Sequence, residues 1–157
     1  MRRTDREVTD PDRIRDVIDG CDCMRIGMID GDEVYIVPLD FGYIETDGMY
    51  TFYFHGAGEG RKAELINSSP YVGFEADAKH EIVEGDEACR CTALYESIIG
   101  NGYASIITDA DEKRRGLDAI MKHATGHGGW DYNEQALDRV CVIKLECTRM
   151  TCKIHEK

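Results

Sequence analysis

The segment from His55 to Lys62, with the sequence HGAGEGRK, combines the features of an anion-binding site. Glycines at positions 56, 58 and 60 permit close backbone approach and unusual dihedral angles just before a predicted helix. A helix start offers free N–H groups and a positive dipole end, so Arg61 and Lys62 are unfavourable there unless an anion binds. Arg61 can bind two phosphate oxygens at once, and Lys62 adds a point charge. These residues favour a phosphate site and a solvated, glycine-rich turn about equally.

The spacing of this segment excludes two common phosphate-binding motifs. The phosphate loop of nucleoside triphosphatases needs a glycine, four further residues and then Gly-Lys-Ser/Thr, which this segment lacks. The G-x-G-x-x-G pattern of dinucleotide-binding folds is also missing, as is a parallel β-α-β context.

Two single side chains could contribute to chemistry or to stacking. His55 ends a predicted strand beside the glycines and is the candidate for proton chemistry, because imidazole titrates near neutrality. The alternative is a structural histidine that hydrogen-bonds the backbone or the phosphate. Trp130 could stack on a planar ligand across a dimer, or could pack in the core. No metal site is expected, because Cys89 and Cys91 form only a C-x-C, short of the usual zinc spacing.

The elements that must position this segment are mainly strands. Helices are predicted at about residues 11–20, 61–67 and 110–124, and strands at 23–29, 33–41, 49–55, 71–76 and 140–147. Residues 89–108 are predicted to form two strands joined or bent at Gly100-Asn101-Gly102. The first three strands are expected to form a meander, because short turns join them at Asp30–Asp32 and Asp47-Gly48. Pro38 favours an edge strand or a bulge. Long antiparallel pieces with few helices point to a closed barrel.

Size and composition narrow the class of protein. At 157 residues the chain is expected to form a single domain, 1–157, and an apolar content of 42% argues against disorder. The net charge of −12 argues against nucleic acid as a partner. No apolar run is long enough for a membrane span, and no secretory signal follows Met1. Seven cysteines without an export signal predict a reducing, cytoplasmic location.

Several segments together resemble the pyridoxamine 5′-phosphate oxidase-like flavoproteins. The stretch Tyr50–Ala76 is similar to the strand–helix–strand core of that superfamily. The similarity is greatest to the branch that includes 5-nitroimidazole resistance proteins. The segments that carry it are MRRTDREVTD at the start, VPLDFGY at Val37–Tyr43, FHGAGEGRK at Phe54–Lys62 and YESIIGNG at Tyr95–Gly102. The resemblance implies an FMN-binding split β-barrel of six antiparallel, Greek-key-like strands flanked by short helices.

The resemblance also implies roles for particular residues. Arg61 and Lys62 would bind the FMN phosphate, with His55 beside the cofactor or substrate. The isoalloxazine would lie against a segment that contacts it mainly through its backbone, made of Val37, Pro38, Leu39 and Asp40. The family often has Asn where this chain has Asp40, and an ionised carboxylate cannot donate a hydrogen bond. Tyr95 and Ser97 lie where the family has a cofactor-facing strand, and Trp130 could stack on the flavin. Such barrels usually form homodimers with flavin at the interface.

Two functions of different kinds follow from this resemblance. In the first, the protein is an oxidoreductase in which FMN passes electrons from NAD(P)H to a small acceptor such as a nitroaromatic or a quinone. In the second, it is a non-catalytic module that stores or senses FMN. A haem-binding barrel is a weaker alternative. Neither nucleic acid nor a membrane is expected as a partner.

Overall fold

The computed structural model describes residues 3–156, so Met1, Arg2 and Lys157 lie outside the described part of the chain. The α-helices are α1 (Pro11–Asp19), α2 (Arg61–Ser68), α3 (Ala110–Thr125) and α4 (Glu134–Arg139). Short 3₁₀ turns cover Thr4–Arg6 and Ala88–Arg90. The strands are β1 (Glu7–Val8), β2 (Met24–Asp30), β3 (Glu33–Leu39), β4 (Phe41–Thr46), β5 (Met49–Gly56), β6 (Tyr71–Val83), β7 (Thr92–Ile107) and β8 (Cys141–His155).

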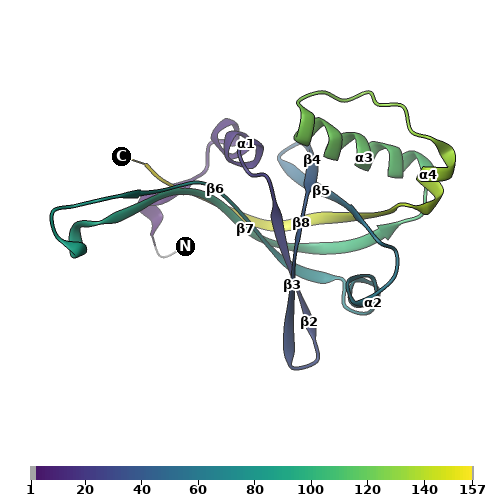
Figure 1. Cartoon of the computed structure of the whole chain (residues 1–157), viewed down its shortest axis with the longest axis horizontal. Helices are drawn as coiled ribbons and strands as arrows, with labels where there is room; N and C mark the ends of the chain where they lie inside the picture. Colours follow the sequence, from purple (N-terminus) through teal and green to yellow (C-terminus); the bar gives the residue numbers. More distant parts are fainter. Residues whose placement is uncertain (1–2, 157) are drawn as a thin grey trace.

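All described strands belong to one antiparallel sheet (Figure 1). Its order is β3-β2-β6-β7-β8-β5-β4, with β1 paired to β8. The predicted fold class, mainly antiparallel β with a few helices, is confirmed. The described part of the chain forms eight strands, whereas six were expected. The sheet is open, so the prediction of a closed barrel is wrong. It stays open because β3 and β4 form its two ends although only Asp40 separates them in the chain.

The predicted meander is wrong for the same reason. Residues 33–41 read as one continuous strand, but the chain leaves the sheet edge at Asp40 and starts β4 on the other edge. The structure therefore contains two separate hairpins, β2–β3 and β4–β5. The turn of the second hairpin is correct as predicted, because Asp47 (φ 53°) and Gly48 (φ 78°) both adopt the left-handed conformation of tight hairpins. The edge position of β3 agrees with the prediction from Pro38.

Helices α1 and α3 begin at the residues predicted, and each has a side-chain cap. Asp10 caps α1 by accepting from the Asp12 N–H at 2.9 Å, with Pro11 in the first position. Asp109 likewise accepts from the Glu112 N–H at 2.8 Å and caps α3. The buried face of α3 is formed by Gly116, Ala119 and Ile120. The short helix α4 was not predicted.

Hydrophobic side chains pack on both faces of the sheet near β5. The larger cluster fills the inside of the curved sheet and contains Phe41, Phe52, Phe54, Ile143 and Leu145 among its most buried members. A smaller cluster lies under α3 and joins Tyr53, Ile107, Ala119, Ile120 and Val142. The smaller cluster fixes α3 against β4 and β5, while β6 and β7 extend beyond the core as a long arm (Figure 1).

We expect Gly42→Ala to loosen the packing of α3 on β4. A Cβ atom at Gly42 would lie 2.2 Å from the backbone carbon and oxygen of Ala119, so the helix must shift. The free energy of unfolding should fall by about 1–3 kcal/mol, which urea denaturation can measure. Gly27→Ala is the matched control, because its nearest contact would be the Gly73 carbonyl oxygen at 3.9 Å. Equal stability of the two variants would contradict this packing.

Candidate functional site

The start of α2 is open to an anion. Strand β5 ends at Gly56, and the chain reaches α2 through Gly60, which has a φ of 96°. Gly60 occupies the N-cap position and provides no side-chain acceptor for the first N–H groups of the helix. These N–H groups therefore retain the capacity to bind an external acceptor, as the sequence predicts.

Lys62 lies beside this helix start. A Cβ atom at Gly56 would lie only 2.5 Å from the Lys62 Nζ atom, so the glycine provides the space that the ammonium group occupies. Lys62 is half-buried and forms no hydrogen bond or ion pair with another residue in the described range 3–156. Its positive charge is thus held near the end of β5 without a carboxylate partner.

Arg61 has a different environment from Lys62. Its Nε atom donates to Asp30 Oδ2 at 2.6 Å, and its Nη2 atom donates to Glu33 Oε2 at 2.7 Å. The guanidinium also lies 4.7 Å from the centre of the Tyr35 ring. The hydrogen bonds that Arg61 donates to Glu33 and Asp30 raise its pKa, so it stays charged. Arg61 therefore ties α2 to the β2–β3 hairpin. Sequence reasoning missed both carboxylates, because they are about 30 residues away in the chain.

The segment Val37–Asp40 lies on the free edge of β3. Val37 and Leu39 turn inward and pack against the core, whereas Pro38 and Asp40 are exposed. An edge strand keeps backbone groups that no neighbouring strand uses. The structure thus leaves this segment able to contact a ligand through its backbone.

His55 is exposed at the end of β5, where it pairs with Val142 of β8. Its ring forms no hydrogen bond with a residue that the structure describes. Of the predicted site residues, His55, Arg61 and Lys62 are therefore brought to the same end of β5.

Tyr95 and Ser97 lie at the opposite end of the sheet. They pair with His155 and Lys153 of β8, whereas His55 pairs with Val142. At about 3.3 Å per residue, roughly 36 Å of β8 separates Val142 from Lys153. Hydrogen bonding to Lys153 lowers the pKa of the Tyr95 phenol. A small ligand bound within one subunit cannot contact both groups of residues.

Trp130 lies in the loop between α3 and α4. Its backbone N–H and that of Gly129 donate to Asp118 Oδ1, at 3.3 and 2.6 Å. Its indole ring packs on His127 with ring centres 4.7 Å apart and is 41% exposed. Trp130 is therefore outside the core, and this loop lies over α3, away from α2 (Figure 1).

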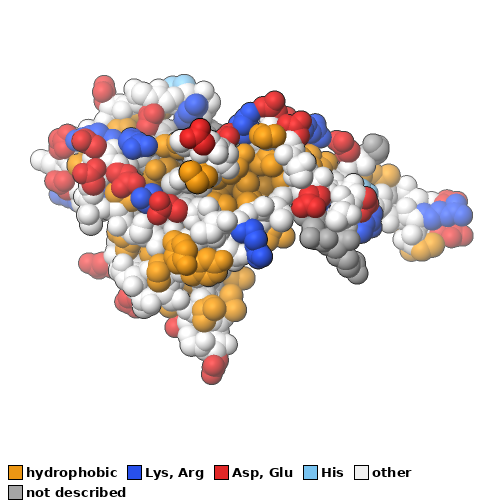
Figure 2. All heavy atoms as spheres, turned by 180° about the vertical axis from the view of Figure 1, so that it is seen from behind, with side chains coloured by type: hydrophobic (Ala, Val, Ile, Leu, Met, Phe, Trp, Pro, Cys, Tyr) orange, Lys and Arg blue, Asp and Glu red, His pale blue; other side chains and the backbone are white. Residues whose placement is uncertain are grey.

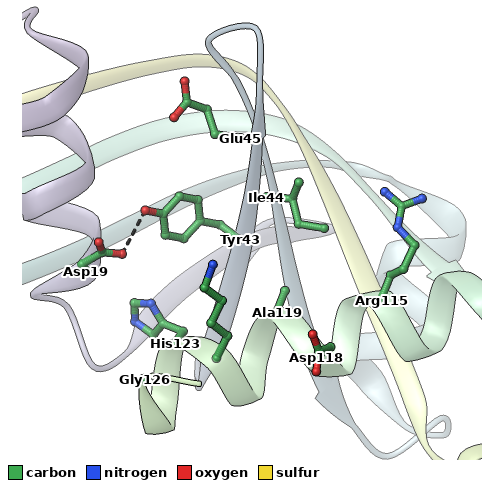
Figure 3. A pocket seen from close by; sticks show the side chains of 10 residues that line it. Asp19, Tyr43, Ile44, Glu45, Arg115, Asp118, Ala119, His123 and Gly126 are labelled. Atoms are coloured by element: carbon green, nitrogen blue, oxygen red, sulfur yellow. Dashed lines mark hydrogen bonds between the residues drawn. The ribbon is translucent and has the colours of Figure 1, made fainter. Parts of the chain in front are cut away.

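A separate cavity of about 670 Å³ lies beside α3. It is lined by Asp19 at the end of α1, by residues 43–45 of β4 and by one face of α3. Figure 3 shows Asp19 at one end of this cavity and Arg115 at the other. None of the predicted site residues lines it. The sequence feature that points to this cavity is the basic run Lys113-Arg114-Arg115.

Three further observations concern metals, thiols and membranes. Within residues 3–156, no group of three or more His, Cys, Asp or Glu side chains could bind a metal ion. All seven cysteines are free, and burial raises the pKa of the Cys21 and Cys152 thiols, to about 12 and about 11. No helix in the described part of the chain is long and apolar enough to cross a membrane.

Comparison with solved structures identifies similar folds. A candidate 5-nitroimidazole antibiotic resistance protein from Bacteroides thetaiotaomicron VPI-5482 is 32% identical, with 94% of this chain and 86% of that chain covered and a TM-score of 0.79. The flavocytochrome Anf3 from Azotobacter vinelandii is 16% identical, with coverage of 100% and 72% and a TM-score of 0.78. An FAD- and heme-binding protein from Mycobacterium smegmatis is also 16% identical, with coverage of 97% and 74% and a TM-score of 0.81. The last two likenesses show a shared fold alone.

Sequence comparison gives the family. No match was found among curated proteins. The model of the family described as pyridoxamine 5′-phosphate oxidase matches residues 10–154. The resemblance inferred from the sequence is thereby confirmed, including its similarity to a candidate 5-nitroimidazole resistance protein. Because the family model covers nearly the whole chain, this chain belongs to the pyridoxamine 5′-phosphate oxidase family.

Proposed function

We propose that this protein binds FMN and that the start of α2 binds the FMN phosphate. The observation that carries the proposal is the uncapped helix start beside the unpaired ammonium group of Lys62. Free N–H groups and a nearby cation together favour a phosphate dianion. The proposal is also supported by the names of two proteins with the same fold, a flavocytochrome and an FAD- and heme-binding protein.

The two cations would contribute unequally to phosphate binding. Lys62 is free to approach the phosphate, whereas two nitrogens of Arg61 already donate to Asp30 and Glu33. Those carboxylates would repel a phosphate that came close to them. Lys62 and the backbone of α2 would therefore make the main contacts, while Arg61 positions the helix and adds its remaining N–H groups.

The edge of β3 would hold the isoalloxazine through the backbone of residues 37–40. Asp40 is exposed there and, when ionised, can only accept hydrogen bonds. His55 ends β5 near the phosphate contacts, and its free ring could bind substrate or move a proton. When bound, FMN would supply the electron transfer, and these residues would supply position and electrostatics.

The most specific form of the proposal is a cytoplasmic reductase. Electrons would come from NAD(P)H and pass to a small acceptor such as a 5-nitroimidazole or a quinone. The likeness to a candidate 5-nitroimidazole antibiotic resistance protein supports this acceptor class. A module that stores or senses FMN without turnover would need the same phosphate contacts but no role for His55.

A homodimer would complete the site. The outer face of the sheet exposes large apolar side chains on β2 and β3, including Ile29, Val34 and Ile36 at 64%, 69% and 61%. Tyr71 and Tyr103 extend this face on β6 and β7, with ring centres 5.1 Å apart. Figure 2 shows hydrophobic side chains gathered on this side of the molecule, down to the hairpin at the bottom of the view. A contiguous apolar surface of this kind is typical of protein interfaces.

Dimerisation would also bring the separated site residues together. Tyr95 and Ser97 are too far along β8 to join His55 in one subunit. Tyr95, Ser97 and Trp130 of a second subunit could reach the flavin across an interface. The proposed homodimer is therefore the arrangement in which every residue expected from the family resemblance can contact the cofactor.

Lys62→Ala should weaken FMN binding but leave riboflavin binding unchanged, because riboflavin lacks the phosphate. Loss of a charged hydrogen bond costs about 1.5–3 kcal/mol, which corresponds to a rise of roughly 10- to 100-fold in the FMN dissociation constant. Flavin fluorescence titration measures both affinities. Arg90→Ala, at the tip of the β6–β7 arm, makes the same charge change far from α2 and is the control. An FMN affinity that Lys62→Ala leaves intact would refute the phosphate site.

His55→Ala should lower turnover and retain FMN. Oxidation of NAD(P)H in the presence of a nitroimidazole, followed by absorbance, gives the rate, and the flavin spectrum gives the occupancy. Loss of FMN together with activity would assign His55 to phosphate binding instead. A wild-type protein that binds FMN but oxidises neither NADH nor NADPH would exclude the reductase and leave the storage or sensing module.

Val34→Lys should shift the protein from dimer to monomer, because a charge would replace an apolar side chain at the proposed interface. Sedimentation velocity measures the mass of the particle, and the FMN affinity should fall in parallel. Met49→Lys is the control, since Met49 is similarly exposed, at 66%, but lies on the opposite hairpin. A wild-type monomer, or equal dissociation in both variants, would contradict the interface.

A further inference from the structure

The cavity beside α3 lies along the second free edge of the sheet. Strand β4 ends the strand order, so no neighbouring strand covers its outer side. Tyr43, Ile44 and Glu45 all line the cavity, although successive residues of a strand point to opposite faces. The cavity therefore wraps around the edge of β4, with α3 as its floor (Figure 3). Its volume of about 670 Å³ is suitable for a small molecule.

Each carboxylate of the cavity already has a partner in the chain. The Tyr43 hydroxyl donates to Asp19 at 2.9 Å, and Arg15 donates to Glu45 at 2.7 Å. Asp118 accepts the two N–H groups of the loop that carries Trp130. The carboxylate oxygens of the cavity are thus hydrogen-bonded within the protein, and Arg15 also neutralises the charge of Glu45.

The two cations of the cavity have no such partners. The side chains of Arg115 and Lys122 form no hydrogen bond or ion pair with any residue from 3 to 156. Their neighbour Arg114 shows the usual behaviour in this acidic chain, since it pairs with Asp111 at 2.8 Å and Glu134 at 2.6 Å. In a protein with a net charge of −12, two unpaired cations that line one cavity indicate an anionic ligand.

The remaining walls are apolar and fixed. Ile44 and Ala119 provide aliphatic surface beside the cations. The His123 ring packs on Phe41 with ring centres 4.3 Å apart, and its Nε2 atom lies 2.8 Å from the Cys21 carbonyl oxygen. Burial raises the pKa of the Tyr43 phenol and so keeps it neutral. The ligand therefore meets the charged groups of Arg115 and Lys122 on α3 and the rings of Tyr43 and His123 on the side toward α1.

We propose that this cavity is a second binding site, separate from the start of α2, for a small organic carboxylate with an apolar or aromatic body. Arg115 binds the carboxylate with its planar guanidinium, and Lys122, two helical turns or about 10 Å along α3, adds attraction. The body of the ligand packs on Ile44, Ala119 and the ring of Tyr43.

Benzoate titration of the ¹⁵N-labelled full-length protein, followed by amide NMR, tests this site. We expect saturable shifts confined to residues 43–45 and 115–126. Benzyl alcohol has a similar shape without the charge, and inorganic phosphate has charge without the apolar body. Both should bind at least about tenfold more weakly than benzoate, because a charge-assisted contact or the buried ring is lost.

A comparison of Arg115→Ala with Arg114→Ala distinguishes binding in the cavity from general attraction of an anion to a basic helix. Arg115→Ala should raise the benzoate dissociation constant about tenfold or more, as expected for loss of a bidentate contact. Arg114→Ala removes the same charge one residue away and should change it less than twofold. Arg115 is exposed, and the dispersion of the amide spectrum verifies that the variant remains folded. Lys122→Ala provides a second, independent loss of affinity.

Several results would overturn the proposal. One is the absence of saturation, and another is saturation with the shifts centred on α2. Equal effects of Arg114→Ala and Arg115→Ala would show only general attraction to a basic helix. Phosphate or benzyl alcohol binding as well as benzoate would exclude the proposed ligand class.

Discussion

The passage of the chain through Asp40 determines much of the architecture. Only this residue separates β3 from β4, yet the two strands are the opposite ends of the sheet. The sheet must therefore curve until its two edges meet at one covalent link, and the core fills the space that this curvature encloses. Because no hydrogen bonds join the edges, each keeps unpaired backbone groups. The proposed flavin surface lies on one edge and the proposed carboxylate site on the other.

The charge distribution around α2 follows from the same curvature. The β2–β3 hairpin comes close to the helix start, so Arg61 pairs with Asp30 and Glu33. An exposed ion pair contributes little stability, but two pairs from one guanidinium fix the orientation of α2. Lys62 is left with space at Gly56 and without a carboxylate. One of two adjacent cations thus serves the fold, and the other remains available to a ligand.

Local signals in the sequence predict the elements well and their pairing less well. Capping by Asp10 and Asp109 and the turn at Asp47-Gly48 depend on neighbouring residues, so they could be predicted. The break at Asp40 could not, because EVYIVPLDF reads as one strand and only the two sheet edges reveal the change.

In the candidate site too, features set by neighbouring residues were easier to predict than contacts between remote strands. The expected phosphate site at residues 55–62 depends on adjacent residues, which favour it and a solvated turn about equally. The carboxylates that engage Arg61, and the distance between His55 and Tyr95, depend on contacts between remote strands. The cavity beside α3 is also formed by remote segments, from α1, β4 and α3. Only the family resemblance connected His55 with Tyr95 beforehand, through the homodimer that it implies.

The anchoring of Trp130 has a practical consequence. It is the single tryptophan of the chain, and its backbone is fixed by Asp118, a carboxylate that also lines the cavity beside α3. Intrinsic ultraviolet emission from indole therefore originates at one known position. The protein carries its own optical probe, next to the cavity beside α3 and remote from the start of α2 within the same subunit.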